Sequence, residues 1–135
     1  MENESAIWVR EAGPVSRMFE FRISAPVHYL TACLIFKDSA PFLDEWIRFH
    51  LTVGFEHLYL YDNDSSDDCE SIIRPFVKRR QVTLRNWPGI GQQRNVFQNC
   101  LDTYRRSARW IAFIDDDEFL YPPPGKQPAG NPTEI

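Results

Sequence analysis

An apolar run that stops abruptly at four acids is the feature that most constrains how this chain can fold. Residues 110–114 (WIAFI) are uninterrupted apolar residues, rich in β-branched and aromatic side chains, and the acids of residues 115–118 (DDDE) follow directly. Such a run is typical of a strand buried on both faces of a parallel sheet. The acids would then lie at the carboxyl end of that strand, where ligands bind in open α/β sheets.

Four neighbouring carboxylates repel one another, so we expect a cation to offset their charge. Magnesium and manganese prefer carboxylate oxygens and usually share them with substrate phosphates. On extended backbone Asp115 and Asp117 would point to the same side and reach one ion, whereas Asp116 would face away towards solvent. The pattern therefore predicts a divalent metal ion held by Asp115 and Asp117. A solvated loop, or a charge cluster near a helix N-terminus, is the alternative.

Three further segments share the apolar, β-prone character of a buried strand. Together with the first run, the expected strands cover residues 29–36, 57–61, 82–84 and 110–114. Residues 19–23 alternate apolar and polar side chains and predict an additional edge or lead-in strand.

Helical patterns separate these strands. The expected helices run from Pro41 to Gly54, from Ser66 or Asp67 through Val77, and over residues 92–106. Pro75 should weaken or end the second helix. The alternation of strand and helix predicts an α/β fold with a Rossmann-like, mostly parallel sheet and flanking helices.

His50 falls on the apolar stripe of the first expected helix. A lone histidine there is more often a hydrogen-bonded packing residue than a ligand. We therefore give it no catalytic role.

Bulk properties narrow the classes of protein that the chain can belong to. Its 135 residues make one domain or part of one, and its net charge of −4 argues against non-specific nucleic-acid binding. Three widely spaced cysteines predict free thiols in a reducing compartment. No signal peptide and no stretch of transmembrane length is apparent, so we expect a cytoplasmic location, with any membrane association provided by a partner.

The segment after the second expected strand, residues 62–68 (DNDSSDD), is rich in oxygen atoms. It does not match a calcium loop, because Asp67 stands where a glycine is needed for the turn and Ile73 where a bidentate glutamate belongs. A strand-to-helix loop is the better interpretation. Its acceptors could bind the N–H groups of a base or the hydroxyls of a sugar.

Arg94 lies in the first turn of the third expected helix, where the helix dipole favours anions rather than cations. An exposed arginine would explain this position, and so would an arginine directed at a bound diphosphate. The residues alone leave both explanations open.

Four motifs in one order resemble a known family. They are residues 30–50 (LTACLIFKDSAPFLDEWIRFH), residues 54–68 (GFEHLYLYDNDSSDD), a helix with Gln93 and Cys100, and residues 109–120 (RWIAFIDDDEFL). The set resembles glycosyltransferase family 92 and the neighbouring family 2-like transferases over roughly residues 29–121. The resemblance divides the chain into a lead-in segment (1–27), a nucleotide-sugar-binding domain (28–121) and a Pro/Gly-rich tail (122–135).

The resemblance implies the GT-A fold, which binds a nucleotide-diphosphate sugar with a divalent metal, usually manganese, for transfer to a glycan or other hydroxyl acceptor. Asp115 would contact the ribose and the water shell of the metal, and Asp117 the metal itself. The remaining residues carried over would contact the nucleotide. Lys37 and Asp38 would line its pocket, Asp62 and Asn63 would contact the base, and Gln93 and Arg94 would lie at the diphosphate.

Members of such families continue for roughly another hundred residues past the Asp-x-Asp motif, as the size of a whole domain requires. That half brings the acceptor site, a further metal ligand and the general base. The chain is therefore expected to be truncated, or to bind donor without completing transfer. Glu118 is the available candidate for the base, although its side of the strand, opposite Asp117, favours a structural role.

Two other classes stay open at this point. One is a non-catalytic nucleotide-sugar-binding or interaction module. The other is a metal-dependent phosphohydrolase, which usually has its acidic motif after the first strand of the sheet, whereas here the acids follow the fourth.

Overall fold

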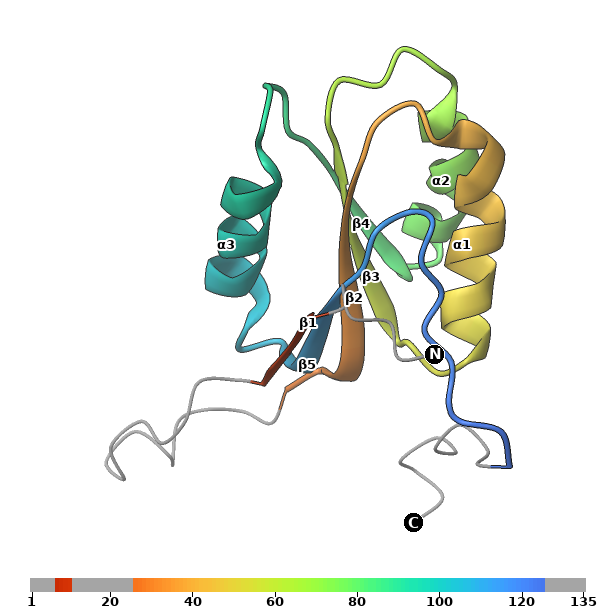
Figure 1. Ribbon diagram of the computed structural model, residues 1–135, viewed down its shortest axis with the longest axis vertical. Coiled ribbons are helices and arrows are strands. Elements are labelled where there is room, and N and C mark those ends of the chain that lie inside the picture. The colour runs from red at the N-terminus through yellow and green to blue at the C-terminus, as the bar shows by residue number, and fades with distance from the viewer. Residues whose placement is uncertain (1–6, 11–25, 126–135) are drawn as a thin grey trace.

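The computed structural model describes residues 7–10 and 26–125. Five strands form one sheet and three helices pack on it (Figure 1). The strands are β1 (Ile7–Arg10), β2 (His28–Phe36), β3 (His57–Asp62), β4 (Val82–Asn86) and β5 (Ala108–Phe113). The helices are α1 (Ala40–Thr52), α2 (Cys69–Lys78) and α3 (Gln93–Tyr104). The predicted α/β class with a mostly parallel sheet is confirmed.

The strand order is β1-β5-β2-β3-β4, and every neighbouring pair from β5 to β4 is parallel. In the register of the sheet, Phe36 lies beside Asp62, and Asp62 lies beside Asn86. The carboxyl ends of β2, β3 and β4 are therefore level. β5 ends slightly earlier, with Phe113 beside Cys33.

Helices cover both faces of the sheet, α1 and α2 on one and α3 on the other (Figure 1). Each face has its own buried cluster. Leu34, Trp46 and Ile73 belong to the cluster under α1 and α2, and Cys33, Tyr61 and Cys100 to the cluster under α3. β2 contributes to both clusters, which explains why its sequence is apolar at almost every position.

Ile7–Arg10 pairs antiparallel with β5, so part of the predicted lead-in segment belongs to the sheet. The strand predicted over residues 19–23 lies outside the described residues, as do residues 126–135 of the predicted tail. No helix in residues 7–10 and 26–125 is both long and apolar enough to cross a bilayer.

Pro75 was predicted to weaken or end the second helix, and it does not end it. The helix continues to Lys78 with Pro75 inside it. Ile73 and Phe76 on either side are buried in the core, and this packing offsets the backbone hydrogen bond that the proline cannot donate. Pro75 therefore removes one backbone hydrogen bond of α2 without interrupting the helix.

Candidate functional site

Loops from the carboxyl ends of the parallel strands meet at one edge of the sheet and hydrogen-bond to one another. The loop after β2 joins the loop after β3 through Asp38, whose backbone N–H donates to the Ser65 hydroxyl (3.0 Å). In return, the carboxylate of Asp38 accepts the backbone N–H of Ser66 (2.6 Å). That bond is the main reason why the pKa of Asp38 is lowered. The predicted site residue Asp38 is thus part of a rigid pair of loops.

Asn63 joins the loop after β3 to the loop after β4. Its side-chain amide donates to the carbonyl oxygens of Trp87 and Gly89, each at 2.7 Å. The backbone N–H of Gly89 donates to the carboxylate of Asp64 (3.3 Å). Because the amide nitrogen of Asn63 is already bonded, its carbonyl oxygen is the group left to meet a ligand.

Asp62 has a different role in the same loop. Its carboxylate accepts the backbone N–H of Ser65 (2.9 Å) and lies 3.7 Å from the thiol of Cys69. The side chain therefore bends back to stabilise its own loop, as aspartates commonly do at turns. Contact of Asp62 with a base remains a prediction.

The four acids form a tight turn, which we call the acid turn (residues 115–118). β5 ends at Phe113, and the backbone N–H of Glu118 donates to the carbonyl oxygen of Asp115 (3.1 Å). The prediction of extended backbone through Asp115 and Asp117 was therefore wrong. In a turn the alternation of sides no longer applies, so the strand argument gives no reason for Asp115 and Asp117 to share a side.

A tryptophan of α1 explains the turn. The indole N–H of Trp46, which is fully buried, donates to the carbonyl oxygens of both Asp115 and Glu118, each at 3.0 Å. The carboxylate of Glu118 accepts the backbone N–H of Asp115 (3.0 Å) and closes the turn from within. Glu118 thus has the structural role that the sequence favoured, while a role as general base stays a prediction.

Asp116 does not face solvent as expected. Its half-buried carboxylate accepts a hydrogen bond from the hydroxyl of Ser39, which lies at the start of α1. Ser39 is itself buried. The acid turn is therefore fixed to the loop after β2 by a side-chain contact as well as to α1 by Trp46.

Asp115 and Gln93, two residues predicted for the site, lie in contact. The amide nitrogen of Gln93, at the start of α3, is 3.3 Å from the Asp115 carboxylate and donates to it. The pKa of Asp115 is raised, chiefly by burial and then by the neighbouring charges of Glu118, Asp117 and Asp116. The site therefore holds negative charge that nothing in the described residues neutralises.

Oxygen ligands of this kind fit a hard divalent cation. Asp115 is half-buried and Asp117 is exposed, so the turn presents carboxylates to solvent at the edge of the sheet. Within residues 7–10 and 26–125 no three acids, histidines or cysteines are gathered around one point. Magnesium typically uses one or two protein carboxylates and completes its shell with water and substrate phosphates, so two aspartates suffice.

The two basic side chains predicted for the site, Lys37 and Arg94, form no ion pair with the acid turn. Lys37 and Arg94 are both exposed, and neither forms an ion pair with any described residue. Arg94 does occupy the first turn of α3, immediately after Gln93. The structure thus gives Arg94 a position beside the site but no contact with it.

His50 packs in the core, as its place on the apolar stripe predicted. Its Nδ1 lies 2.8 Å from the Trp46 carbonyl oxygen, and its Nε2 lies 3.3 Å from the backbone N–H of Leu120. The first atom must donate and the second accept, so the ring is neutral. Burial lowers its pKa to about 4 from the ordinary value of 6.5.

Lowering the pH from 7 to 5 is expected to reduce the free energy of unfolding by about 2 kcal/mol through His50 alone. The unfolded chain binds a proton at His50 near pH 6.5, whereas the folded chain does so only near pH 4. Stability is therefore present above pH 6.5 and is lost as the pH falls towards 4. Urea titrations at pH 7 and pH 5 measure the difference.

His57 also has a pKa lowered by burial and contributes in the same direction, so the His50 share requires a matched variant. His50→Gln cannot titrate and should show a shallower loss of stability between the two pH values. An equally steep loss in His50→Gln would contradict the assignment.

Sequence reasoning missed Ser39, Trp46 and the aromatic pair Phe42 and Phe119, all of which touch or flank the acid turn. One signal was available for Trp46. A tryptophan on the buried stripe of a helix needs an acceptor for its indole N–H, and carbonyls outside that helix are the usual source.

Comparison with known proteins identifies the family of the chain. The family model described as Glycosyltransferase family 92 matches residues 28–133. The chain belongs to glycosyltransferase family 92. A family 92 protein of Oryza sativa subsp. japonica is 36% identical over 97 residues, which are 71% of this chain and 17% of that protein. A Ricinus communis member is 32% identical over 109 residues, or 80% of this chain and 19% of that protein.

The galactan β-1,4-galactosyltransferase GALS1 of Arabidopsis thaliana is 26% identical over 107 residues, covering 72% of this chain and 22% of that protein. Among solved structures, S. aureus TarS 1-349 superposes with a TM-score of 0.51 at 14% identity, covering 69% of this chain and 28% of that one. This likeness shows the fold. The family 92 chain spans about a fifth of the length of the curated relatives that it matches.

Proposed function

We propose that this family 92 domain binds a nucleotide-diphosphate sugar with a divalent cation, Mn²⁺ or Mg²⁺, for transfer of the sugar to a hydroxyl acceptor. One observation carries the proposal. Asp115 of the acid turn meets Gln93 of α3 at the edge where the loops after β2, β3 and β4 are bonded together. Ligands of open α/β sheets bind at this edge.

In the proposed complex, Asp115 and Asp117 would hold the cation beside the diphosphate of the donor. When bound, the cation would stabilise the negative charge that develops on the leaving nucleoside diphosphate. Gln93 fixes the orientation of the Asp115 carboxylate. Arg94, one residue further along the exposed start of α3, would contribute positive charge to bind the diphosphate.

Asn63 and Asp38 shape the nucleoside side of the proposed site. The free carbonyl oxygen of Asn63 would accept an N–H group from the edge of a base, because its amide nitrogen is bonded to Trp87 and Gly89. Lys37 and Asp62 lie on the same loops and complete the rim. All four common bases offer such an N–H group, so this oxygen does not select one nucleotide, and UDP and GDP are tested first as representatives of a pyrimidine and a purine donor.

The two remaining parts of a transferase site are the general base and the acceptor, and the candidates for them come from Glu118 and from the comparison with GALS1 respectively. Glu118 has its carboxylate bonded to the backbone of Asp115, so base catalysis would require that bond to break. The relative GALS1 is named for galactan and galactosyl transfer. UDP-galactose and β-1,4-galactan are therefore the natural first donor and acceptor pair.

Removal of the metal tests the proposal directly. UDP, GDP and inorganic phosphate are titrated into the chain by calorimetry, with Mn²⁺ and then with excess EDTA. We expect a nucleoside diphosphate to bind only with Mn²⁺, because a diphosphate placed beside unneutralised carboxylates would be repelled. Phosphate that binds as well as UDP would favour a phosphohydrolase instead. Absence of binding to all three ligands would overturn the proposed function.

A further inference from the structure

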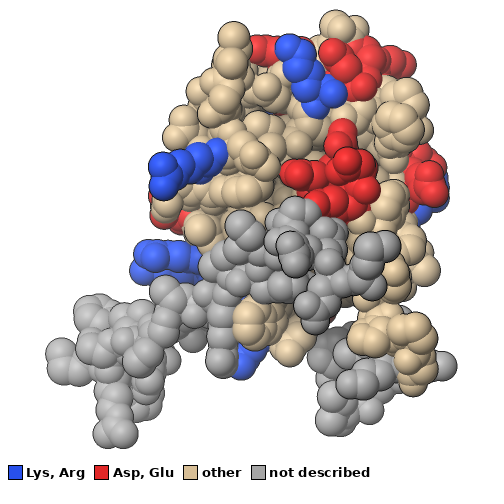
Figure 2. All heavy atoms as spheres, viewed as in Figure 1, with Lys and Arg blue, Asp and Glu red and all other residues tan. Residues whose placement is uncertain are grey.

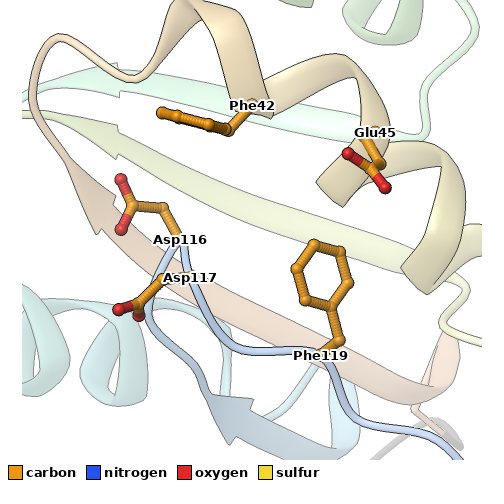
Figure 3. Close-up of a pocket in the computed structure, with 5 residues that line it drawn as sticks. All are labelled: Phe42, Glu45, Asp116, Asp117 and Phe119. Atoms are coloured by element: carbon orange, nitrogen blue, oxygen red, sulfur yellow. The ribbon is translucent and has the colours of Figure 1, made fainter.

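A pocket of about 330 Å³ opens between α1 and the segment that follows β5 (Figure 3). Phe42 and Glu45 line it from α1, and Asp116, Asp117 and Phe119 line it from the other side. Figure 3 shows Asp116 directed towards Phe42, and Phe119 directed towards Glu45. The pocket thus shares Asp117 with the candidate cation site, borders Asp116 of the same turn, and adds two aromatic rings to them.

Phe42 is not needed by the core. Its side chain is 59% exposed, whereas Leu43, Trp46 and Ile47 of the same helix are fully buried. An aromatic ring exposed on the wall of a pocket gives a large and rigid contact surface to a ligand at little cost in conformational entropy. Phe119 is half-buried and forms the opposite wall, supported by an edge contact with Phe49.

The three carboxylates of the pocket are not equivalent. Asp116 accepts the hydroxyl of Ser39, and Asp117 is the cation ligand of the proposed function. Glu45 is exposed and makes no hydrogen bond or ion pair with any residue in the described part of the chain. It is therefore the carboxylate available to accept hydrogen bonds from an occupant.

We propose that this pocket binds one neutral pyranose ring of the acceptor glycan. The C–H face of the ring packs on Phe42, and a hydroxyl donates to Glu45. This combination of aromatic surface and carboxylate oxygen matches a sugar, which has an apolar face and a rim of hydroxyl donors. The pocket volume lies near the lower end of the ~300–1,000 Å³ range of small-molecule sites, as expected for one ring.

The position of the pocket supports the acceptor rather than the donor nucleotide as its occupant. The residues assigned to the nucleotide lie on the loops after β2, β3 and β4, and none of them lines the pocket, which is formed by α1, two acids of the acid turn and Phe119. An acceptor there would lie next to the cation and its diphosphate. The inference rests on the proposed function, because a sugar in this pocket is an acceptor only if a sugar donor binds beside it.

Ligand-observed saturation-transfer NMR tests the pocket in the 135-residue chain with UDP and Mg²⁺ present, because Mg²⁺ is diamagnetic and does not broaden the signals of a neighbouring ligand. Methyl β-galactoside, methyl β-glucoside and choline serve as probes. We expect at least one glycoside to bind and Phe42→Ala to weaken its affinity about tenfold, the effect of losing one well-packed aromatic contact. Glu45→Gln should weaken it about threefold, because the amide keeps only part of the acceptor capacity.

Tyr29→Ala is the matched control. Tyr29 is 50% exposed and lies at the start of β2, away from the carboxyl ends of the strands, so its loss should leave glycoside binding unchanged. UDP affinity with Mn²⁺ should be the same in the parent chain and in Phe42→Ala.

The other outcomes overturn the pocket proposal, the donor-site proposal or both. UDP binding without glycoside binding, or glycoside binding that Phe42→Ala leaves intact, overturns the pocket and spares the donor site. Choline binding in place of glycosides shows a cation pocket built on Phe42 and also overturns the inference. Glycoside binding without any nucleotide binding overturns the donor site, and with it the assignment of the pocket to an acceptor.

Discussion

Asp117→Asn is expected to lower the affinity for UDP in the presence of Mn²⁺ about a hundredfold or more. Loss of a group that merely orients a metal ligand typically costs about 10- to 100-fold, so loss of a ligand itself should lie at or above that range. The amide keeps the size of the side chain but removes its charge. Isothermal titration calorimetry of UDP at a fixed Mn²⁺ concentration measures the effect.

Asp117→Asn should hardly change the stability of the chain, so a loss of UDP affinity can be attributed to the lost carboxylate. Asp117 is exposed and its side chain makes no hydrogen bond within the described residues. Asp44→Asn is the matched control, because Asp44 is also an exposed acid, and among the described residues its carboxylate bonds only to Arg48 (2.9 Å). UDP affinity that falls equally in both variants would reflect net charge rather than a cation ligand.

Asp116→Asn separates the two carboxylates further. Asp116 bonds to Ser39 and is not assigned to the cation. Its amide variant should retain metal-dependent UDP binding far better than Asp117→Asn. The reverse order would place the cation on Asp116 and overturn the assignment.

Trp46→Ala is expected to lower the free energy of unfolding by about 3–5 kcal/mol, the usual cost of deleting a large buried side chain. Trp46 is fully buried among the residues under α1, and its indole N–H serves two carbonyl oxygens of the acid turn. Urea denaturation followed by circular dichroism measures the loss. Ligand binding by this variant does not test the role of the indole in the site, because a stability loss of this size unfolds part of the protein.

Trp46→Phe isolates the hydrogen bonds from the packing. Phenylalanine keeps most of the apolar surface but leaves the carbonyls of Asp115 and Glu118 without their donor, which should cost about 1–3 kcal/mol. Trp87→Phe is the control, because the indole of Trp87 is half-buried and donates to a single acceptor, the side-chain oxygen of Gln92, at 3.2 Å. A smaller loss in Trp46→Phe than in Trp87→Phe would show that the indole does not hold the turn.

The surface agrees with a site that needs a cation. Figure 2 shows a compact group of acidic side chains near the middle of this face of the molecule, with few basic side chains beside it. Electrostatic repulsion within such a group is relieved more effectively by one divalent ion than by distant lysines or arginines.

Local sequence pattern was sufficient to predict most of the fold. β2, β3 and α1 lie close to where their patterns placed them, because an uninterrupted apolar run and a capped amphipathic stretch are local signals. The membership of Gln93 and Asp115 in one site was also predicted, and their contact is found at 3.3 Å. The family resemblance, rather than spacing, gave that pair.

The shape of the acid turn could not be predicted in the same way. The residue that bends it, Trp46, lies 69 positions earlier in the chain than Asp115. Aspartate is depleted in strands and common in turns, so the motif itself favours a turn, but it does not show which distant residue holds that turn. The orientation of Asp116 depends on Ser39, 77 positions away, and was missed for the same reason.

Domain boundaries and the identity of the bound metal and nucleotide remain predictions. The metal and the nucleotide are separate molecules, and the domain boundaries depend on contacts between distant residues. A local sequence pattern encodes neither. The calorimetric experiments above address the metal and the nucleotide directly.

The pairing of β1 with β5 has a consequence for biosynthesis. Ile7 lies beside Phe113, so the amino-terminal strand leaves the ribosome roughly a hundred residues before its partner is made. Until then, β2, β3 and β4 can associate through sequential β-α-β units, whereas residues 7–10 lack their native partner. Contacts of such long separation form late and slow the overall rate of folding, so β1 should be the last strand added to the growing domain.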